Sequence, residues 1–237
     1  MSSRRAGWAA AHAPLDDPEA VASLLDSLRE AGADEQAAAL LARDPAAHTA
    51  LDNPGYVARL MDTLREAGED EQAAALAARA AAHTALDDAD GVNFLLYTLR
   101  AAGADEQAAA LAARAAAHAA LDNLPGLARL IDGLREAGAH EQAAALAARV
   151  AAHAPLDGHF GVYDVADLLH SLRRADAHEQ AAALVARLPA AGQFGYFRLE
   201  NRPADQFRFG READGTPAAP WGWEDLDLWL VPRLRRP

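Results

Sequence analysis

Cysteine and lysine are both absent from this chain of 237 residues, so all 22 basic side chains are arginines. Without cysteine the chain can form no disulfide, no thiolate nucleophile and no Cys-ligated zinc site. Without lysine it lacks Schiff-base chemistry and the phosphate-binding lysine of a P-loop, and the glycine-rich patterns GxxxxGK and GxGxxG do not occur. We therefore expect no nucleotide cofactor, and we predict neither a metal nor any other cofactor.

Positive charge is also scarce, because 35 acidic residues outnumber the basic ones and the formal net charge is -13. Basic residues that displace counterions drive nucleic-acid binding, so we predict no nucleic-acid partner. No stretch has the 18 or more consecutive apolar residues of a transmembrane helix, and the N-terminus lacks the apolar middle region of a signal peptide. We expect no membrane partner and a cytoplasmic protein. The surplus of Ala, Arg, Gly and Pro is typical of a high-GC bacterial genome.

An internal repeat of about 35 residues runs through most of the chain. A histidine recurs at one position of each unit, with intervals of 36, 35, 35 and 35 residues: His12, His48, His83, His118 and His153. The glutamates of a Glu-Gln-Ala-Ala-Ala-Leu string follow the same period: Glu35, Glu71, Glu106, Glu141 and Glu179. The last interval, of 38, indicates a three-residue insertion around residues 158–163. The single extra residue of the first unit lies near Asp44 and Pro45. Periods of this length are typical of stacked helical units.

Each unit is predicted to form two helices, named helix A and helix B. Helix A begins at an Asp or Asn that can cap free amides, as at Asn53, and the following Pro54 is tolerated in the first turn. Its apolar residues have the spacing of one buried helical face: Val57, Leu60, Met61 and Leu64 in the second unit. A glycine ends helix A in four units: Gly32, Gly68, Gly103 and Gly138. Helix B begins at an acidic pair and is rich in alanine.

Two such helices cannot bury their apolar faces alone, so each unit must pack against its neighbours. The sequence therefore predicts an all-α fold, a right-handed α-solenoid of about five helix-turn-helix units. We divide the chain into an N-terminal half-repeat or cap at residues 1–14, the repeat array at 15–188, and an aromatic-rich C-terminal cap at 189–237. Residues 6–12 resemble the end of a helix B, with Trp8 in the position that Arg79 occupies.

The pattern resembles the tetratricopeptide repeat, whose unit has 34 residues. The first unit matches it at Val21, Leu24, Leu28, Gly32 and Ala37, and the next two units match at the equivalent positions. The unit here is one residue longer, and a large residue follows the first leucine where the family has a small one. We describe the chain as tetratricopeptide-like, with another α-solenoid subclass as the alternative. It also resembles long Ala-rich repeat proteins of actinobacteria.

The C-terminal block has a different composition, because eight of the 14 aromatic residues fall after residue 189. Alternating aromatics, Phe194 with Tyr196 and Phe207 with Phe209, predict one or two short strands or an irregular hairpin. A cap over the last unit is the simpler interpretation of the block. The alternative is an aromatic docking patch for a partner, formed by Trp221, Trp223 and Trp229.

The histidine series suggests a metal at first sight, but geometry argues against it. Neighbouring units stack at about 8 to 10 Å, whereas metal-bound nitrogens lie about 2.0 to 2.1 Å from the ion. Adjacent histidines of the series therefore cannot readily share one ion. We interpret them as residues that close helix B.

The candidate binding site lies on helix A of the third unit. An arginine recurs on helix A in all five units: Arg29, Arg65, Arg100, Arg135 and Arg173. In three units an Asp precedes it by three residues, which predicts an ion pair within the helix for Asp26, Asp62 and Asp132. In the third unit Tyr97 replaces this Asp, and Asn93 and Phe94 replace Ala and a polar residue. The resemblance implies that this part of helix A lines a concave groove that holds extended peptides.

We therefore hypothesise a peptide-binding surface centred on the third unit and formed by Arg65, Asn93, Phe94, Tyr97, Arg100 and Arg135. Arginine suits carboxylate recognition because its guanidinium donates two parallel hydrogen bonds. The predicted function is a non-enzymatic protein- or peptide-interaction module, a scaffold or sensor whose partner the sequence does not identify. The alternatives are a structural subunit that self-assembles into a homo-oligomer, and an enzyme with its site in the acidic, tryptophan-rich C-terminal segment around Glu224.

Overall fold

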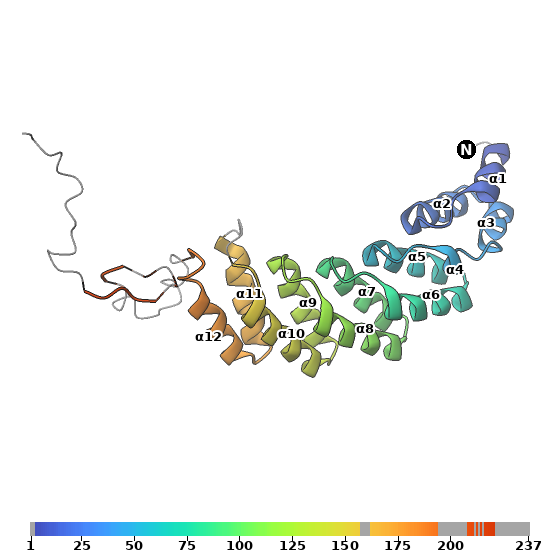
Figure 1. Ribbon diagram of the computed structural model, residues 1–237. Helices are drawn as coiled ribbons and strands as arrows, with labels where there is room; N and C mark the ends of the chain where they lie inside the picture. The colour runs from blue at the N-terminus through green and yellow to red at the C-terminus, as the bar shows by residue number, and fades with distance from the viewer. Residues whose placement is uncertain are drawn as a thin grey trace, which may run out of the picture.

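The computed structural model describes residues 3–156, 162–193, 208–210, 212, 214 and 216–220 (Figure 1). These residues form twelve α-helices and almost no strand, which confirms the all-α prediction. The helices A are α2 (Pro18–Glu30), α5 (Pro54–Glu66), α7 (Ala89–Ala101), α9 (Leu124–Glu136) and α11 (Val162–Arg174). The helices B are α3 (Asp34–Leu41) with α4 (Pro45–His48), α6 (Asp70–His83), α8 (Asp105–His118), α10 (His140–His153) and α12 (His178–Arg187). Helix α1 (Ser3–His12) precedes them.

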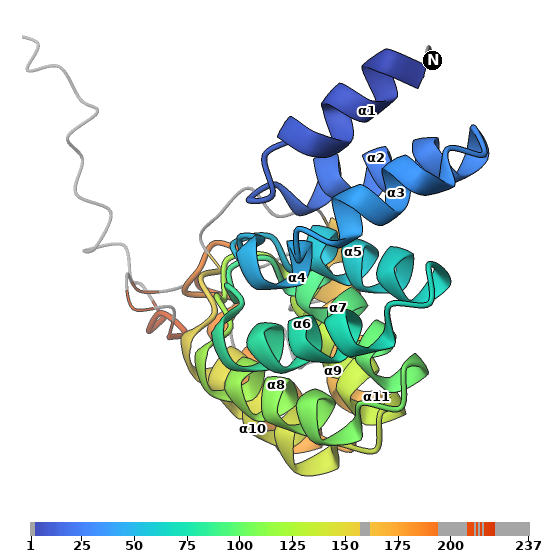
Figure 2. The same ribbon diagram turned by 90° about the vertical axis from the view of Figure 1, so that its right-hand side faces the viewer.

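The helices form two rows that run along the length of the molecule. Helices α2, α5, α7, α9 and α11 pack side by side in one row, and α4, α6, α8, α10 and α12 do so in the other. Each helix A also packs on the helix B that follows it in the chain, and α1 packs on α3. Figure 1 shows α1 and α12 at opposite ends of the array, and in Figure 2, which looks along the array, the two rows lie beside each other.

The helix starts follow the predicted capping residues. The side chains of Asp17, Asn53, Asp88 and Asn123 each accept a hydrogen bond from a backbone N–H in the first turn of the next helix A. Such a cap stabilises a helix by about 1 kcal/mol, because it satisfies an amide that has no partner within the helix. The acidic pairs at the start of α3, α6 and α8 lie beside the positive end of the helix dipole.

The predicted glycines end helix A in the expected conformation. Gly32, Gly68, Gly103 and Gly138 have φ values of 62, 81, 71 and 75°, which a side chain with a Cβ rarely adopts. The fifth unit has Asp176 there, with φ 56°, and Asp tolerates this conformation better than most residues. The turn from helix A to helix B is therefore alike in all five units.

The core is continuous along the array and combines large side chains from helix A with small ones from helix B. Leu60, Leu95 and Leu130 are fully buried in successive helices A. Alanines such as Ala80 and Ala115 are fully buried in the helices B. Burial of one leucine contributes about 1.5–3 kcal/mol, and the alanines let the helices B approach one another closely. Neighbouring units thus share one core.

The first unit departs from the others at the predicted extra residue. Its helix B is interrupted after Leu41, and Asp44 adopts φ 52° before Pro45 opens α4. Pro45 cannot continue the preceding helix, because it has no N–H to donate and its ring clashes with the previous turn. The Asp44 carboxylate instead caps the new helix by accepting from the Ala47 N–H.

Some predictions fall on residues outside the described part of the chain. These include residues 158–161 of the three-residue insertion predicted around 158–163, and the strands or hairpin expected at Phe194, Tyr196 and Phe207. Phe209 is described and lies in a turn rather than in a strand, and the backbone N–H of Ala218 donates to the carbonyl oxygen of the adjoining Gly210. Within the described ranges, no helix is long and apolar enough to cross a membrane.

Candidate functional site

A cavity of about 470 Å³ opens on the helix A row between α7 and α9. Four of the six residues that we predicted for the binding surface line it: Asn93, Phe94, Tyr97 and Arg100. Asp90 of α7 also lines it, as do Arg129, Gly133 and Glu136 of α9 and Ala137, which directly follows α9. We refer to it as the unit-three cavity. The structure thus brings together most of the predicted surface.

Aromatic side chains are exposed at this cavity. Tyr97 is 69% exposed and Phe94 is 45% exposed, although aromatic residues are usually buried more fully. At the positions equivalent to Phe94 the second and fourth units have Arg59 and Arg129. The positions equivalent to Tyr97 hold Asp26, Asp62 and Asp132 in the first, second and fourth units. Helix A therefore exchanges charged side chains for aromatic ones in this unit alone among the first four.

This exchange changes the ion pairs between neighbouring helices A. Arg59 of the second unit pairs with Asp26 of the first, at 3.4 Å. The equivalent partner of Arg129 would be Tyr97, which cannot form an ion pair. Arg129 contacts Asp90 instead, with its Nε and Nη2 at 2.6 and 2.8 Å from the two carboxylate oxygens. Hydrogen bonds from this guanidinium lower the pKa of Asp90 below its ordinary value.

The exchange also changes the contact between α5 and α7, on the other side of α7 from α9. Phe94 stands where an arginine would pair with Asp62, and no ion pair joins α5 to α7 within the described residues. Asp62 pairs with Arg65 of its own helix, at 3.7 Å. Its partial burial is the largest influence on its pKa, which is raised, and the charge of Arg65 opposes this change. Phe94 thus takes the position of an arginine that would join the two units by an ion pair.

Asn93 is accommodated by a glycine in the next unit. A Cβ built on Gly133 would lie 1.8 Å from the Asn93 Oδ1, far closer than any real contact. The other units have Ser or Thr at the position of Gly133 and Ala at the position of Asn93. The amide therefore occupies space that a larger residue on α9 would fill. Asn93 and Gly133 form one matched pair across 40 residues of sequence.

The recurring helix A arginines of units two to four have different surroundings: Arg65, Arg100 and Arg135. Arg100 lines the unit-three cavity, and its Nη1 lies 3.5 Å from the Glu136 carbonyl oxygen. No carboxylate is within ion-pair distance of Arg100 in the part of the chain that the structure describes. Arg135 lies outside the cavity and pairs with Asp132 and Glu136, at 3.9 and 3.3 Å. Arg65 lies outside the cavity as well. The cavity therefore includes fewer residues than the binding surface that we predicted.

The ion pairs predicted within helix A are present in two units of three. Arg65 and Arg135 contact the Asp three residues before them. Arg29 instead contacts Glu66 of the next unit, through the carboxylate at 3.2 Å and the backbone carbonyl at 2.9 Å. The prediction for Asp26 and Arg29 is wrong, because the partner for each residue comes from the next unit.

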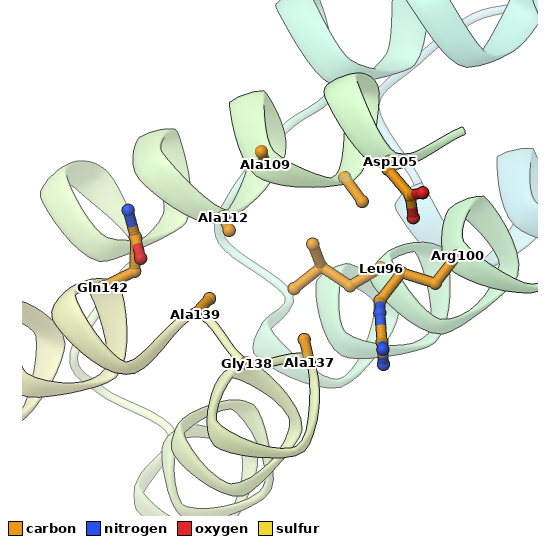
Figure 3. A pocket seen from close by; sticks show the side chains of 10 residues that line it. Leu96, Arg100, Asp105, Ala109, Ala112, Ala137, Gly138, Ala139 and Gln142 are labelled. Atoms are coloured by element: carbon orange, nitrogen blue, oxygen red, sulfur yellow. The ribbon is translucent and has the colours of Figure 1, made fainter. Parts of the chain in front are cut away.

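Two further cavities lie at the edge where each helix A turns into helix B, and we call them the edge cavities. The larger measures about 400 Å³, and Figure 3 shows Leu96 pointing into it between α8 and the turn that joins α9 to α10. The smaller measures about 250 Å³. They have equivalent linings one unit apart: Met61, Arg65, Asp70, Ala73, Ala74, Ala77, Ala102 and Ala104 in one, and Leu96, Arg100, Asp105, Ala108, Ala109, Ala112, Ala137 and Ala139 in the other. Gly138 and Gln142 complete the larger. Arg100 borders both this edge cavity and the unit-three cavity.

An arginine of helix B connects each unit to the one before it, a feature that the sequence analysis missed. The Nη1 and Nη2 of Arg114 donate to the carbonyls of Ala81 and Thr84 at the end of α6, each at 2.9 Å. Arg149 donates in the same way to Ala116 and Ala119. Equivalent arginines in the other units each donate to at least two carbonyls: Arg43, Arg79 and Arg187. Their shared period in the sequence was the available signal.

We call these helix B arginines the arginine clamps. Their acceptors are backbone carbonyls at the C-terminal end of a helix. The last four carbonyls of a helix have no intrahelical donor, and the negative end of the helix dipole attracts a cation. In helix α1 the clamp position is occupied by Trp8, which stacks on His12 with ring centroids 5.0 Å apart. Trp8 is 67% exposed. Among the described residues the arginine clamps therefore run from Arg43, between α3 and α4, to Arg187 in α12.

The histidine series lies at the ends of helices, as we predicted. His12, His48, His83, His118 and His153 are the last residues of α1, α4, α6, α8 and α10, and all are exposed. The His12 Nδ1 lies 2.9 Å from the Trp8 carbonyl oxygen, in the last turn of α1. Among the described residues, no group of three potential ligands could hold a metal ion.

The predicted C-terminal aromatic patch, Trp221, Trp223 and Trp229, lies outside the described residues. No family model, curated protein or solved structure matches the chain. The candidate site therefore rests on the geometry of this molecule alone.

Proposed function

We propose that the chain is a right-handed, tetratricopeptide-like α-solenoid that binds an extended peptide segment of a partner protein at the unit-three cavity. The single observation that carries this proposal is the exposed pair Phe94 and Tyr97 beside Asn93 and Arg100. Exposed aromatic side chains are costly to leave in water and are enriched in the residues that dominate binding energy. The helices A on either side use these positions for charged residues.

The chemistry of the cavity suits an extended peptide that offers one apolar side chain and backbone N–H and C=O groups for hydrogen bonding. Phe94 and Tyr97 offer apolar contact area, and Tyr97 adds a hydroxyl. The Asn93 amide can donate to a peptide carbonyl and accept from a peptide N–H. The Arg100 guanidinium has donors that no carboxylate of the described residues occupies. Together these groups can recognise a backbone and a side chain at once, without any group that performs covalent chemistry.

A peptide-display selection against the protein tests this proposal. We expect the selected peptides to share an aromatic or large aliphatic residue, and to lose at least tenfold in affinity with Phe94→Ala combined with Tyr97→Ala. This loss follows because two aromatic contacts of about 1 kcal/mol or more each would be removed. Both side chains are solvent-exposed, so the variant should remain folded.

Tyr163→Ala provides the matched control, because Tyr163 is exposed on helix A of the fifth unit and borders neither the unit-three cavity nor an edge cavity. Peptides should bind this variant as they bind the original protein. Equal binding to the double variant would show that the site lies elsewhere.

A further inference from the structure

The two edge cavities repeat with the period of the array, so a ligand that fills both must itself be periodic. Packed helices lie about 8 to 10 Å apart, which sets the separation between equivalent points of neighbouring units. The cavity at Arg65 and the cavity at Arg100 are such points. A bound chain must therefore present a side chain to the same face about every 8 to 10 Å.

The polyproline II conformation meets this requirement directly. It has three residues per turn and a rise of about 3.1 Å per residue, so every third side chain recurs on one face after about 9 Å. A β-strand returns a side chain to one face after about 6.6 Å and again after about 13 Å, which misses the period. An α-helix matches only at every seventh residue, about 10.5 Å, and its width of about 10 to 12 Å does not suit cavities of this size.

The linings suit small apolar side chains. Each edge cavity is walled by four or more alanines and one larger apolar residue, Met61 in one and Leu96 in the other. Residues of the size of proline or valine fit volumes of about 250 and 400 Å³ together with the adjoining backbone. Proline also loses little conformational freedom on binding, because its φ is already restricted.

The charge of the protein at this edge indicates which residues of the ligand lie between its apolar ones. In each of the first four units the acidic residues at this edge equal or outnumber the basic ones, and the basic residue is the helix A arginine. The acidic residues are Glu30, Asp34 and Glu35; Glu66, Glu69, Asp70 and Glu71; Asp105 and Glu106; and Glu136 and Glu141. All of them are exposed or half-buried. A cationic ligand complements this edge.

We propose that the edge cavities bind a basic, proline-rich segment of the partner in the polyproline II conformation, with a small apolar residue at every third position. The inference rests on the proposed peptide binding and specifies its ligand. The segment enters the edge cavities at Arg65 and Arg100 in turn. Since Arg100 also borders the unit-three cavity, one chain can continue from the edge to Phe94 and Tyr97.

Synthetic peptides of one composition but different spacing test the proposal. The probes are fluorescein-labelled 15-residue peptides of Pro, Val and Arg, with Val at every third position in one and at every second or fourth position in the others. Fluorescence anisotropy should give the first peptide at least tenfold higher affinity, and the affinity should fall as salt increases. Equal affinity across the series, or tighter binding of an added helical peptide with apolar residues seven apart, would overturn it.

Two variants of the protein locate the binding. Ala74 and Ala109 are exposed residues that line the edge cavities, so Ala74→Leu with Ala109→Leu should fill the cavities and weaken the third-position peptide at least tenfold. The matched control is Ala75→Leu with Ala110→Leu, because both residues are exposed on the same helices and neither lines an edge cavity. Equal weakening by both pairs of substitutions would contradict the assignment.

The same variants separate this inference from the proposed function. If display-selected peptides need Phe94 and Tyr97 but bind the filled variant normally, the edge inference fails and peptide binding at the unit-three cavity stands. If the third-position peptide binds through the edge cavities and the aromatic double variant retains every selected peptide, the unit-three cavity is not the site.

Discussion

Helices α6 and α8 have the same fourteen-residue sequence, whereas α5 and α7, which pack on them, share only five of thirteen residues. The five are Val57, Leu60, Thr63, Leu64 and Arg65 with their equivalents in α7. All but the arginine are buried. Helices α6 and α8 thus use the same residues to join neighbouring units. Helices α5 and α7 share buried residues but differ in most of their exposed ones. Variation at the surface is where recognition of a partner can differ from unit to unit.

The largest effect should come from breaking a clamp in the helix B row. Arg114→Ala removes two hydrogen bonds from a charged donor to carbonyls at the end of α6, and hydrogen bonds to charged groups contribute about 1.5–3 kcal/mol each. Because the guanidinium is only part-buried, we expect the free energy of unfolding to fall by about 2–4 kcal/mol. Denaturant unfolding followed by circular dichroism measures this.

Arg100→Ala is the control for the clamp variant, because Arg100 is exposed on helix A and donates only one long hydrogen bond. It should change the free energy of unfolding by less than about 0.5 kcal/mol. Similar losses for the two variants would show that the helix B row has no special role in joining units.

A smaller effect is expected from the matched pair of Asn93 and Gly133. Gly133→Ser would place a Cβ on the Asn93 amide, and overpacking of this kind costs about 1–3 kcal/mol. The loss of a helical glycine returns up to about 1 kcal/mol, so we expect a net loss of about 1–2 kcal/mol. The substitution gives α9 the residue type that other units have there.

The double variant with Asn93→Ala sharpens this test. It removes the amide that the new side chain would meet, so stability should return to that of the original protein or exceed it. Unfolding free energies of the two single variants and the double variant give the coupling between the residues. If the two effects simply add, the amide of Asn93 does not occupy the space at Gly133.

The smallest effect is expected from the surface pair of Arg129 and Asp90. Both side chains are more than one-third exposed, so Asp90→Asn should cost only about 0.5–1 kcal/mol at neutral pH, and less at high salt. Arg129 lowers the pKa of Asp90 in the folded chain. The contribution is therefore complete above the ordinary carboxyl pKa and is lost as the pH falls through the lowered value.

Unfolding measured from pH 7 to pH 2 checks this dependence. The difference between the original protein and Asp90→Asn should shrink toward zero at the acid end of the range. A difference that grows on acidification would contradict the assignment of the pair.

The elements of the fold could be predicted from local sequence because their signals are local. The caps at Asp17 and Asn53 and the glycines at 32 and 68 act on the adjoining turn, so their spacing predicted where helices begin and end. The sequence also placed the extra residue of the first unit near Asp44 and Pro45, and the structure interrupts the first helix B there because Pro45 cannot continue a helix. These effects do not depend on the neighbouring unit.

The contacts between units could not be predicted in the same way. Asp26 lies three residues before Arg29, yet it pairs with Arg59, 33 residues further on. Asn93 meets a position 40 residues away. Such partners depend on how neighbouring helices align, and no sequence pattern within one helix determines that alignment. The clamp arginines did have a signal in their period, but their acceptors are backbone carbonyls, which carry no mark in the sequence.

The residues of the candidate site were found because they broke a pattern. Asn93, Phe94 and Tyr97 were selected as exceptions among equivalent repeat positions, and the recurring Arg100 was selected because Tyr97 replaces the Asp three residues before it. The structure places all four around one cavity. Arg65 and Arg135 were included only as neighbours in the column, and they lie outside that cavity. A departure from the repeat was thus a better guide to the site than membership of the repeat.

The most direct test gives unit three the surface of its neighbours. Asn93→Ala, Phe94→Arg and Tyr97→Asp together restore the residue types that the second and fourth units have at these positions. Calorimetric titration of the strongest display-selected peptide into this triple variant and into the original protein compares the two surfaces. We predict at least a tenfold loss of affinity with an unchanged thermal midpoint. Undiminished affinity for the triple variant would contradict the claim that the varied helix A surface of unit three recognises the partner.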